Sequence, residues 1–197
     1  MGIVQPSPVT LRDGSTVTIR SALAEDAAAV IDAAKRIFGQ TDMVLTQPDE
    51  FTISVEDEEA LLGKRAESAT GLYVIAEVSA TSHGPEGRAT KIIAIAGLDP
   101  ASRRRVMHNV TLGIMVDSVW HKRGVGDAMM AALMGWARAN SAVRRVQLEV
   151  VASNAHAVRL YARHGFVTEG RRRGVFQRQP GVFEDDLIMA CDVAAGR

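Results

Sequence analysis

The sequence predicts one α/β domain over residues 1–197, in which helices flank a single mixed sheet. The chain is 47% hydrophobic, which at this length supplies a core without disulfides or metal. Segments with strand-like alternation and β-branched residues are interspersed with segments of helical periodicity. An early pair of strands is followed by a strand–helix–strand–helix–strand run, an order typical of a mixed sheet covered by helices.

The first half of the chain is predicted to hold three strands and two helices. The first helix is rich in alanine and ends at Gly39, a residue that stops helices. Residues 81–87 are a cluster of turn-forming residues, so the strands on either side of them should form a hairpin. The expected elements are a strand over 16–19, helices over 25–38 and 56–67, and strands over 72–78 and 91–98.

The second half carries the clearest helix, which has Met129, Leu133 and Trp136 at helical spacing. A shorter helix follows, with Asn154 as its N-cap and Gly165 as the residue that ends it. The expected elements are a strand over 110–116, a helix over 126–140, a strand over 143–151, a helix over 154–164, and strands over 166–169 and 186–192.

Composition excludes several classes of protein. The 23 basic and 23 acidic side chains cancel, so no overall charge points to a nucleic-acid or membrane-surface partner. The one cysteine, Cys191, cannot form an internal disulfide framework, and the five histidines lack metal-binding spacing, so we expect no metal. No apolar run reaches the roughly 18 residues of a membrane helix, and the first residues lack the basic patch and apolar stretch of a signal peptide, so we expect neither. We expect a cytoplasmic protein.

The balanced total conceals an asymmetry between the two halves. Residues 1–98 carry 8 basic and 14 acidic side chains, whereas residues 99–197 carry 15 and 9, which gives −6 against +6. One interpretation is two solvated faces of opposite sign. The other is that the second half meets an anion and the first half, with its acidic run at 49–59, meets a cation.

A glycine pair lies between a predicted strand and the clearest helix. Gly124 and Gly126 allow the backbone to come close to a ligand, and the helix N-terminus beside them offers unpaired amides. Lys122 and Arg123 add positive charge, so the segment suits an anion, most often phosphate. A tight turn without a ligand is the alternative. No Gly-Lys-Ser/Thr follows, which excludes a P-loop, and Met129 stands where a dinucleotide fingerprint needs Gly or Ala.

A second motif follows about thirty residues later. A strand ends, an asparagine caps a helix, and a tyrosine lies two turns inside that helix. Taken alone, Asn154 is an ordinary cap and Tyr161 an ordinary core tyrosine. The motif residues are Asn154, Ala157, Tyr161, Gly165 and Phe166.

The two motifs together resemble the GNAT superfamily of acyl-CoA-dependent N-acyltransferases, over residues 17–193. His121, Gly124 and Gly126 match its [Q/R]-x-x-G-x-[G/A] signature, and the second motif matches its N-x-x-A-x-x-x-Y-x-x-x-G-F pattern. The resemblance implies a mostly antiparallel twisted sheet of six to seven strands with about four helices, splayed between its central strands. His121 departs from the usual Gln or Arg, which puts one pyrophosphate contact in doubt.

The resemblance also implies a reaction and a site. Acetyl-CoA would donate an acetyl group directly to a primary amine in a ternary complex, without a metal. Asn154 would lie near the pantetheine arm, Tyr161 would protonate the departing thiolate, and a backbone amide of Met115 or Val116 would meet the thioester. The pyrophosphate would bind the segment formed by His121, Lys122, Arg123, Gly124, Val125, Gly126 and Asp127.

The base is a separate question. Glu149 precedes Tyr161 by twelve residues, a spacing that resembles the ribosomal-protein N-terminal acetyltransferases, where such a glutamate acts through water. The alternative is that Glu149 is a charge on the polar face of a strand. Asp117 is a second candidate, unless it only starts the turn before Gly124, and bulk water is a third.

The acceptor remains open at this point. A small amine or amino acid is one class of acceptor, and a protein amino group is the other. Dimerisation is common in the superfamily, so a homodimer is a further expectation. A non-catalytic acyl-CoA-binding module on the same fold is the alternative function.

The arginine runs at 103–105 and 171–173 are interpreted as solvated loops, or as contacts to the 3′-phosphate of CoA or to an acidic partner.

Overall fold

A computed structural model describes residues 3–79 and 90–193, and these form one eight-stranded sheet with helices on its faces. The order across the sheet is β1-β2-β3-β4-β5-β6-β8-β7. The strands are β1 (Ser7–Thr10), β2 (Thr16–Ser21), β3 (Leu72–Ser79), β4 (Thr90–Pro100), β5 (Asn109–Val116), β6 (Arg145–Val151), β7 (Val167–Gln179) and β8 (Val182–Asp192). The helices are α1 (Ala27–Phe38), α2 (Val55–Glu67), α3 (Val125–Ala139) and α4 (Ala155–Arg163), with short 3-10 turns η1 (Ala24–Asp26), η2 (Arg104–Val106) and η3 (Ser118–Trp120).

All seven predicted strands and four predicted helices are present, and one further strand brings the sheet to eight rather than six or seven. The additional strand is β1, four residues long and largely exposed. It contains Pro8, which is tolerated here because β1 is an edge strand. β7 continues ten residues past the predicted end at 169. β3 and β4 form the predicted antiparallel hairpin, whereas the turn cluster at 81–87 lies outside the described residues.

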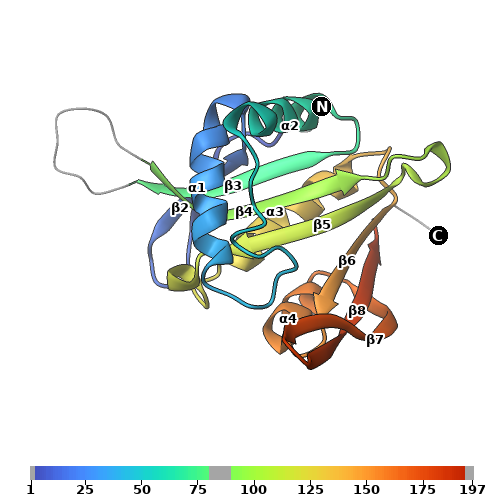
Figure 1. The fold of residues 1–197 in the computed structure, drawn as a ribbon. Helices are drawn as coiled ribbons and strands as arrows, with labels where there is room; N and C mark the ends of the chain where they lie inside the picture. Colours follow the sequence, from blue (N-terminus) through green and yellow to red (C-terminus); the bar gives the residue numbers. More distant parts are fainter. Residues whose placement is uncertain (1–2, 80–89, 194–197) are drawn as a thin grey trace.

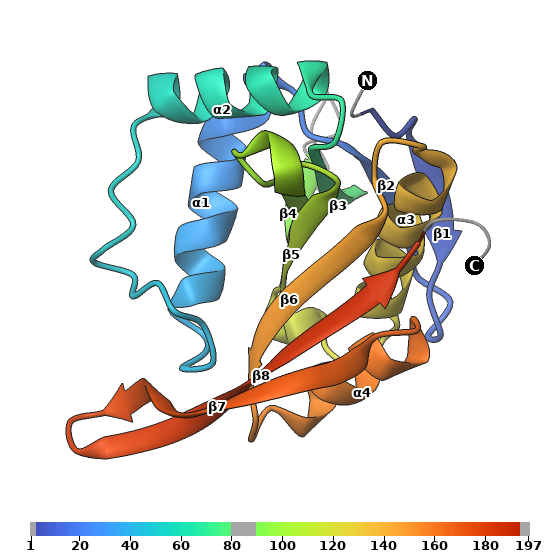
Figure 2. The same ribbon diagram turned by 90° about the vertical axis from the view of Figure 1, so that its right-hand side faces the viewer.

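The helices cover the sheet on both faces. Figure 2 shows α1 and α2 on one side of the sheet and α3 on the other, with α4 beside β6, β8 and β7. The side chains of β3 alternate accordingly. Leu72 and Val74 join the buried cluster that contains Met129 and Leu133 of α3, whereas Ile75 joins the cluster that contains Val30 of α1. Each face of the sheet therefore has its own core.

The parallel pair β5–β6 separates partway along. The two strands are paired only from Asn109–Arg145 to Thr111–Gln147. Beyond that point β5 stays paired with β4 up to Val116, and β6 stays paired with β8 up to Val151. The ribbons of β5 and β6 diverge toward the lower part of Figure 1. The splay expected from the family resemblance is therefore present, and it opens the interior of the sheet.

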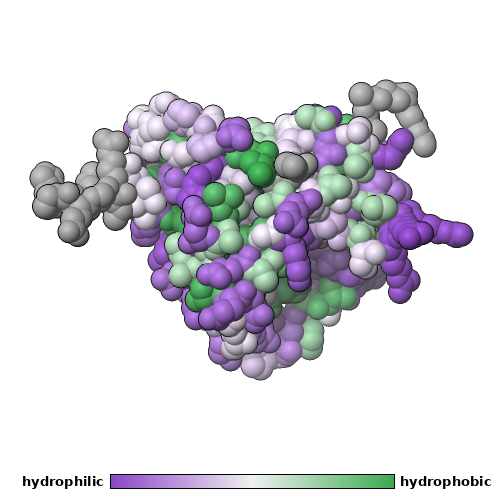
Figure 3. Space-filling model, turned by 90° about the horizontal axis from the view of Figure 1, so that it is seen from above, coloured by the Kyte–Doolittle hydropathy of each residue, from purple (hydrophilic) through white to green (hydrophobic). Residues whose placement is uncertain are grey.

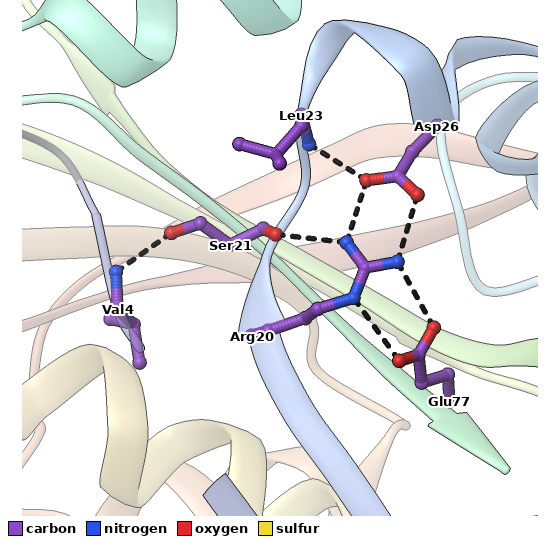
Figure 4. A network of polar contacts seen from close by, with 6 residues as sticks. All are labelled: Val4, Arg20, Ser21, Leu23, Asp26 and Glu77. Atoms are coloured by element: carbon purple, nitrogen blue, oxygen red, sulfur yellow. Dashed lines mark hydrogen bonds and ion pairs between the residues drawn. The ribbon is translucent and has the colours of Figure 1, made fainter. Parts of the chain in front are cut away.

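A polar network fixes the start of α1 to the sheet, away from the splay (Figure 4). The guanidinium of Arg20 on β2 donates to both oxygens of Asp26, at 2.7 and 2.8 Å, and to both oxygens of Glu77, at 3.1 and 3.0 Å. Asp26 also accepts from the amide of Leu23 at 2.8 Å. Two bidentate pairs on one arginine give a defined geometry that joins β2, η1 and β3.

The surface is mixed in polarity. On the face drawn in Figure 3, hydrophilic residues cover most of the area and hydrophobic residues form smaller patches between them. Such intermixing is ordinary for a protein surface. Within residues 3–79 and 90–193, none of the helices combines the length and apolar character that spanning a membrane requires.

Candidate active site

A cavity of about 580 Å³ lies where β5 and β6 separate. Its walls come from the ends of β5 and β6, the first turns of α3 and α4, the segment from the end of α1 to residue 46, and the β7–β8 hairpin. Eight of the twelve predicted site residues line it: Met115, Val116, His121, Lys122, Gly126, Glu149, Asn154 and Tyr161. The other four, Arg123, Gly124, Val125 and Asp127, lie beside it in the same turn.

The turn between η3 and α3 depends on its two glycines. Gly124 has φ +103°, a conformation that side chains with a Cβ rarely adopt. Gly126 faces α4, and a Cβ there would lie 3.2 Å from Leu160 Cδ2, so the glycine permits close approach of the two helices. The first helical hydrogen bond of α3 runs from the amide of Ala128 to the carbonyl of Gly124. The amides of residues 125–127 therefore precede the helical ladder and are available to an anion.

Arg123 and Asp127 brace the turn rather than line the cavity. Arg123 pairs with Asp13 at 3.1 Å and lies over the ring of Trp120. Asp127 pairs with Arg163 at 2.9 Å and with Arg12 at 3.2 Å. The contact from Arg12 was not predicted, because it depends on β1, which brings the N-terminal hairpin against a turn more than a hundred residues away.

His121 and Val116 connect the turn to the splayed strand. The Nε2 atom of His121 lies 2.9 Å from the carbonyl oxygen of Val116. The amide of Asp117 donates to Ile93 on β4, so the backbone of Asp117 faces β4. Because backbone groups alternate along a strand, the amide of Val116 faces the gap toward β6, whereas that of Met115 faces β4. Of the two predicted amides, the one at Val116 has the orientation that meets a ligand in the gap.

Positive charge gathers at the end of the cavity near α4. Lys122 and His156 line it, and Arg159 follows one turn later on α4. Burial and the nearby charges of His121 and Arg159 lower the pKa of His156. His156 is therefore held mostly neutral at neutral pH, and Lys122 and Arg159 supply the fixed positive charge at this end, which favours an anionic ligand.

Tyr161 and Asn154 reach the cavity from α4. Asn154 caps the helix, since its Oδ1 accepts from the amide of Ala157 at 3.1 Å. Tyr161 is 8% exposed and packs against Phe166, with ring centroids 6.0 Å apart. Burial raises the pKa of Tyr161 to about 12. The phenol is therefore protonated at neutral pH and can donate a proton.

Glu149 enters the cavity from β6 and is paired with Arg172 of β7. Arg172 also binds Asp186 of β8, with Nε at 3.0 and 3.2 Å from the two carboxylate oxygens. All three side chains line the cavity. From the sequence, the run at 171–173 was interpreted as a solvated loop, or as a contact to the 3′-phosphate of CoA or to an acidic partner. No local signal identified Arg172 or Asp186, because their contact arises from the register in which β7 pairs with β8.

Asp117 has a structural role that makes it unsuitable as the base. It is 1% exposed, accepts from Arg36 at 3.0 Å and from the amide of Val119 at 3.2 Å, and thereby starts η3. Although burial acts to raise the pKa of Asp117, hydrogen bonds from Arg36, Val119 and Gln40 lower it overall. The alternative interpretation, that Asp117 starts the turn before Gly124, agrees with this geometry.

Two charged runs are absent from the cavity. The acidic residues at 49–59 do not line it, and Glu56, Asp57 and Glu58 lie in the first turn of α2, where they favour the helix dipole. The interpretation that the acidic half meets a cation stays a prediction. The arginines at 103–105 belong to the connection between β4 and β5, and they do not line it either. Within residues 3–79 and 90–193, no group of three His, Cys, Asp or Glu side chains is arranged to hold a metal ion.

Comparisons with known proteins agree with this geometry. The model of the acetyltransferase (GNAT) family matches residues 40–166. L-amino acid N-acetyltransferase AaaT from Escherichia coli (strain K12) is 35% identical over 97 residues, which is 47% of this chain. The match spans only 57% of the length of that relative.

Solved structures extend the similarity to most of the chain. An acetyltransferase of the GNAT family from Streptococcus pneumoniae is 29% identical, with a TM-score of 0.79 over 90% of this chain and 99% of its own. A putative acetyltransferase from Salmonella typhimurium, solved with acetyl-CoA, has a TM-score of 0.74 at 18% identity, over 93% of this chain and 97% of its own. At that identity the second structure supports the fold alone.

Proposed function

Because the chain belongs to the acetyltransferase (GNAT) family, we propose that it is an N-acetyltransferase that transfers an acetyl group from acetyl-CoA to a primary amine. The cavity carries this proposal. It runs from the turn at 121–126 through the gap between β5 and β6, and it brings Tyr161 and Glu149 to one space. An anion-binding turn joined to a buried phenol and a carboxylate is what transfer from a phosphate-bearing thioester requires.

The turn would hold the diphosphate of acetyl-CoA. The amides of residues 125–127 at the N-terminus of α3 would donate to its oxygens, and Lys122 would add a charge. Along the gap, the amide of Val116 would donate to the acyl carbonyl, where negative charge develops as the amine attacks. Asn154, at the cap of α4, would lie along the pantetheine arm.

Tyr161 and Glu149 would then handle the protons. The amine nitrogen forms a bond to the acyl carbon, and the bond from that carbon to sulfur breaks. Tyr161 would give its proton to the departing sulfur, and the resulting phenolate, which burial disfavours, would take a proton back from water. Glu149, reached through water, would take the proton that the amine loses. Its pairing with Arg172 orients the carboxylate.

The acceptor is a primary amine in this proposal. The similarity to an L-amino acid N-acetyltransferase supports a small acceptor. Homodimerisation, a cytoplasmic location and a reaction without metal remain predictions. Sedimentation of the purified chain tests the first, localisation of a tagged chain tests the second, and activity after treatment with a chelator tests the third.

A screen of primary amines with acetyl-CoA, in which released thiol is measured, tests the activity. The parent should show turnover with at least one amine, and Tyr161→Phe should reduce kcat by about 10²-fold or more, since general acid catalysis contributes that much. Tyr73→Phe is the matched control, because Tyr73 is a half-buried tyrosine outside the cavity. Tight acetyl-CoA binding without turnover for any amine would favour the non-catalytic binding module instead.

A further inference from the structure

The two ends of the cavity differ in character. The end formed by η3, the turn and α4 carries His121, Lys122 and His156. The opposite end lies between the segment from the end of α1 to residue 46 and the β7–β8 hairpin. We call it the acceptor end. In Figure 2 that segment and the tip of the hairpin lie on one side of the molecule and α4 on the other. The apolar residues of the acceptor end are Ile37, Phe38, Met43, Val44, Leu45, Val175 and Phe176.

The acceptor end is closed by a contact between its two walls. Arg178 on β7 pairs with Asp42 at 2.9 Å and with Glu184 on β8 at 2.8 Å. The segment after α1 is therefore held against the hairpin, and the apolar residues of both walls face a shared space. An acceptor that fills this space buries an apolar group.

The charged side chains that line the cavity at the acceptor end, apart from the contact of Arg178 with Asp42 and Glu184 in its walls, leave one negative charge in excess. Glu149 and Asp186 each carry −1, and Arg172 carries +1. Hydrogen bonds to Asp186 and Glu149 raise the pKa of Arg172, so it stays charged. Among the described residues that line this end, Arg172 is the one lysine or arginine, and its Nε and Nη2 atoms already bind carboxylates.

We propose that the acceptor is a primary amine that bears an apolar group and lacks a free carboxylate. This rests on the proposed function and narrows it. The ammonium form of such an amine complements the excess negative charge. A free amino acid in the same ammonium form would bring a third carboxylate to one guanidinium, which leaves one negative charge unbalanced in a half-buried site, a costly arrangement. A simple amine and the N-terminal residue of a peptide share the favoured chemistry.

A set of acceptors with a common phenyl ring tests the proposal. Phenethylamine and L-phenylalanine have amino groups of similar basicity and differ in the carboxylate. With saturating acetyl-CoA at pH 8, kcat/KM for phenethylamine should exceed that for L-phenylalanine by at least tenfold. L-phenylalaninamide and a peptide that begins with phenylalanine distinguish the two sources. Phenethylamine or the amide as the better substrate indicates a small amine, and the peptide as the better substrate indicates an N-terminus. Either result supports the proposal, provided that kcat/KM for phenethylamine and for the better of the amide and the peptide exceeds kcat/KM for L-phenylalanine.

Asp186→Asn removes the excess charge at a residue that is 7% exposed. It should reduce the ratio of kcat/KM between phenethylamine and L-phenylalanine at least threefold. Asp192→Asn is the matched control, because Asp192 lies on the same strand outside the cavity, and there the ratio should not change. Equal or better use of L-phenylalanine by the parent would overturn the proposal, while acetyl transfer itself would stand. Failure of every amine would overturn the proposed function together with this inference.

Discussion

The Nε2 atom of His121 lies 2.9 Å from the carbonyl oxygen of Val116, at the end of the splayed strand. Because a carbonyl can only accept, the ring nitrogen must carry the proton and donate it. His121 thus holds the turn before α3 against β5, and this is a task that the Gln or Arg usual in the family motif can also perform. The departure from that motif therefore preserves a donor.

We predict that His121→Ala weakens acetyl-CoA binding about fivefold, since a typical hydrogen bond contributes about 1 kcal/mol. His121→Gln should recover most of the affinity, because its amide can donate to Val116. Isothermal titration with acetyl-CoA measures both. His108→Ala, in the connection between β4 and β5, serves as the control. If glutamine binds no better than alanine, the hydrogen bond is not what positions the turn.

A second prediction concerns the backbone of the turn. Gly124→Ala should cost about 1–2 kcal/mol of unfolding free energy, because residue 124 has φ +103°. Any relaxation of that strain moves the amides at the start of α3, so acetyl-CoA affinity should fall at least tenfold. Gly135→Ala, in the middle of α3 with open space around it, should instead stabilise the protein by up to about 1 kcal/mol. Urea denaturation and titration of both variants measure these effects, and equal acetyl-CoA affinity in both would refute the prediction.

The pH dependence of kcat should report the state of Tyr161. Burial raises the pKa of Tyr161 to about 12, so the phenol stays protonated at the pH where an ordinary tyrosine near 10 would ionise. We expect kcat of the parent not to fall between pH 8 and 10.5 through ionisation of Tyr161. The pH profiles of the parent and of Tyr161→Phe should therefore have the same shape over this range. A stopped assay over this range, with denaturation checked by circular dichroism, measures it. A descending limb near pH 10 in the parent and not in the variant would contradict the burial of the phenol.

Local features of the site were predictable from the sequence, whereas contacts between distant strands were not. Gly124 and Asn154 act through their own backbone and the helix beside them, so their residue types and spacing are informative. Arg172 and Asp186 meet because β7 and β8 pair in one register, and neither interpretation of the run at 171–173, as a solvated loop or as a contact to CoA or an acidic partner, placed Arg172 beside Asp186. β1 was missed because a short edge strand with a proline carries almost no hydrophobic pattern.

The same distinction between local features and distant contacts explains why the sequence alone made Asp117 a candidate base. Sequence position at the end of a splayed strand made it a candidate base, but its environment is set by α1. Arg36 reaches it from that helix, and the contact spans 81 residues of chain. A carboxylate that is buried and held by a guanidinium is stabilised in its charged form and is a weak base. Charge and burial at such a position follow from how helix and sheet pack, which the periodicity of α1 alone does not specify.

The stability of the fold should fall in acid through Asp26. Burial acts to raise the pKa of Asp26, but hydrogen bonds from Arg20 and the amide of Leu23 lower it overall (Figure 4). A folded-state pKa below the unfolded value of about 3.9 contributes stability that is fully present above that value. It is lost as the pH falls through the lowered pKa, because the unfolded chain takes up the proton first.

Asp26→Asn should therefore be less stable than the parent at pH 7, and the difference in unfolding free energy should shrink as the pH drops from 5 to 3. Urea denaturation at each pH measures this difference. Asp32→Asn, at an exposed position on α1, is the matched control and should change the unfolding free energy by less than about 0.5 kcal/mol at any pH. A difference between Asp26→Asn and the parent that stays constant with pH would mean that the carboxylate acts only through its shape. Arg20 would then hold η1 by packing and by hydrogen bonds that an amide at residue 26 can accept equally well, with no contribution from its ion pair with Asp26.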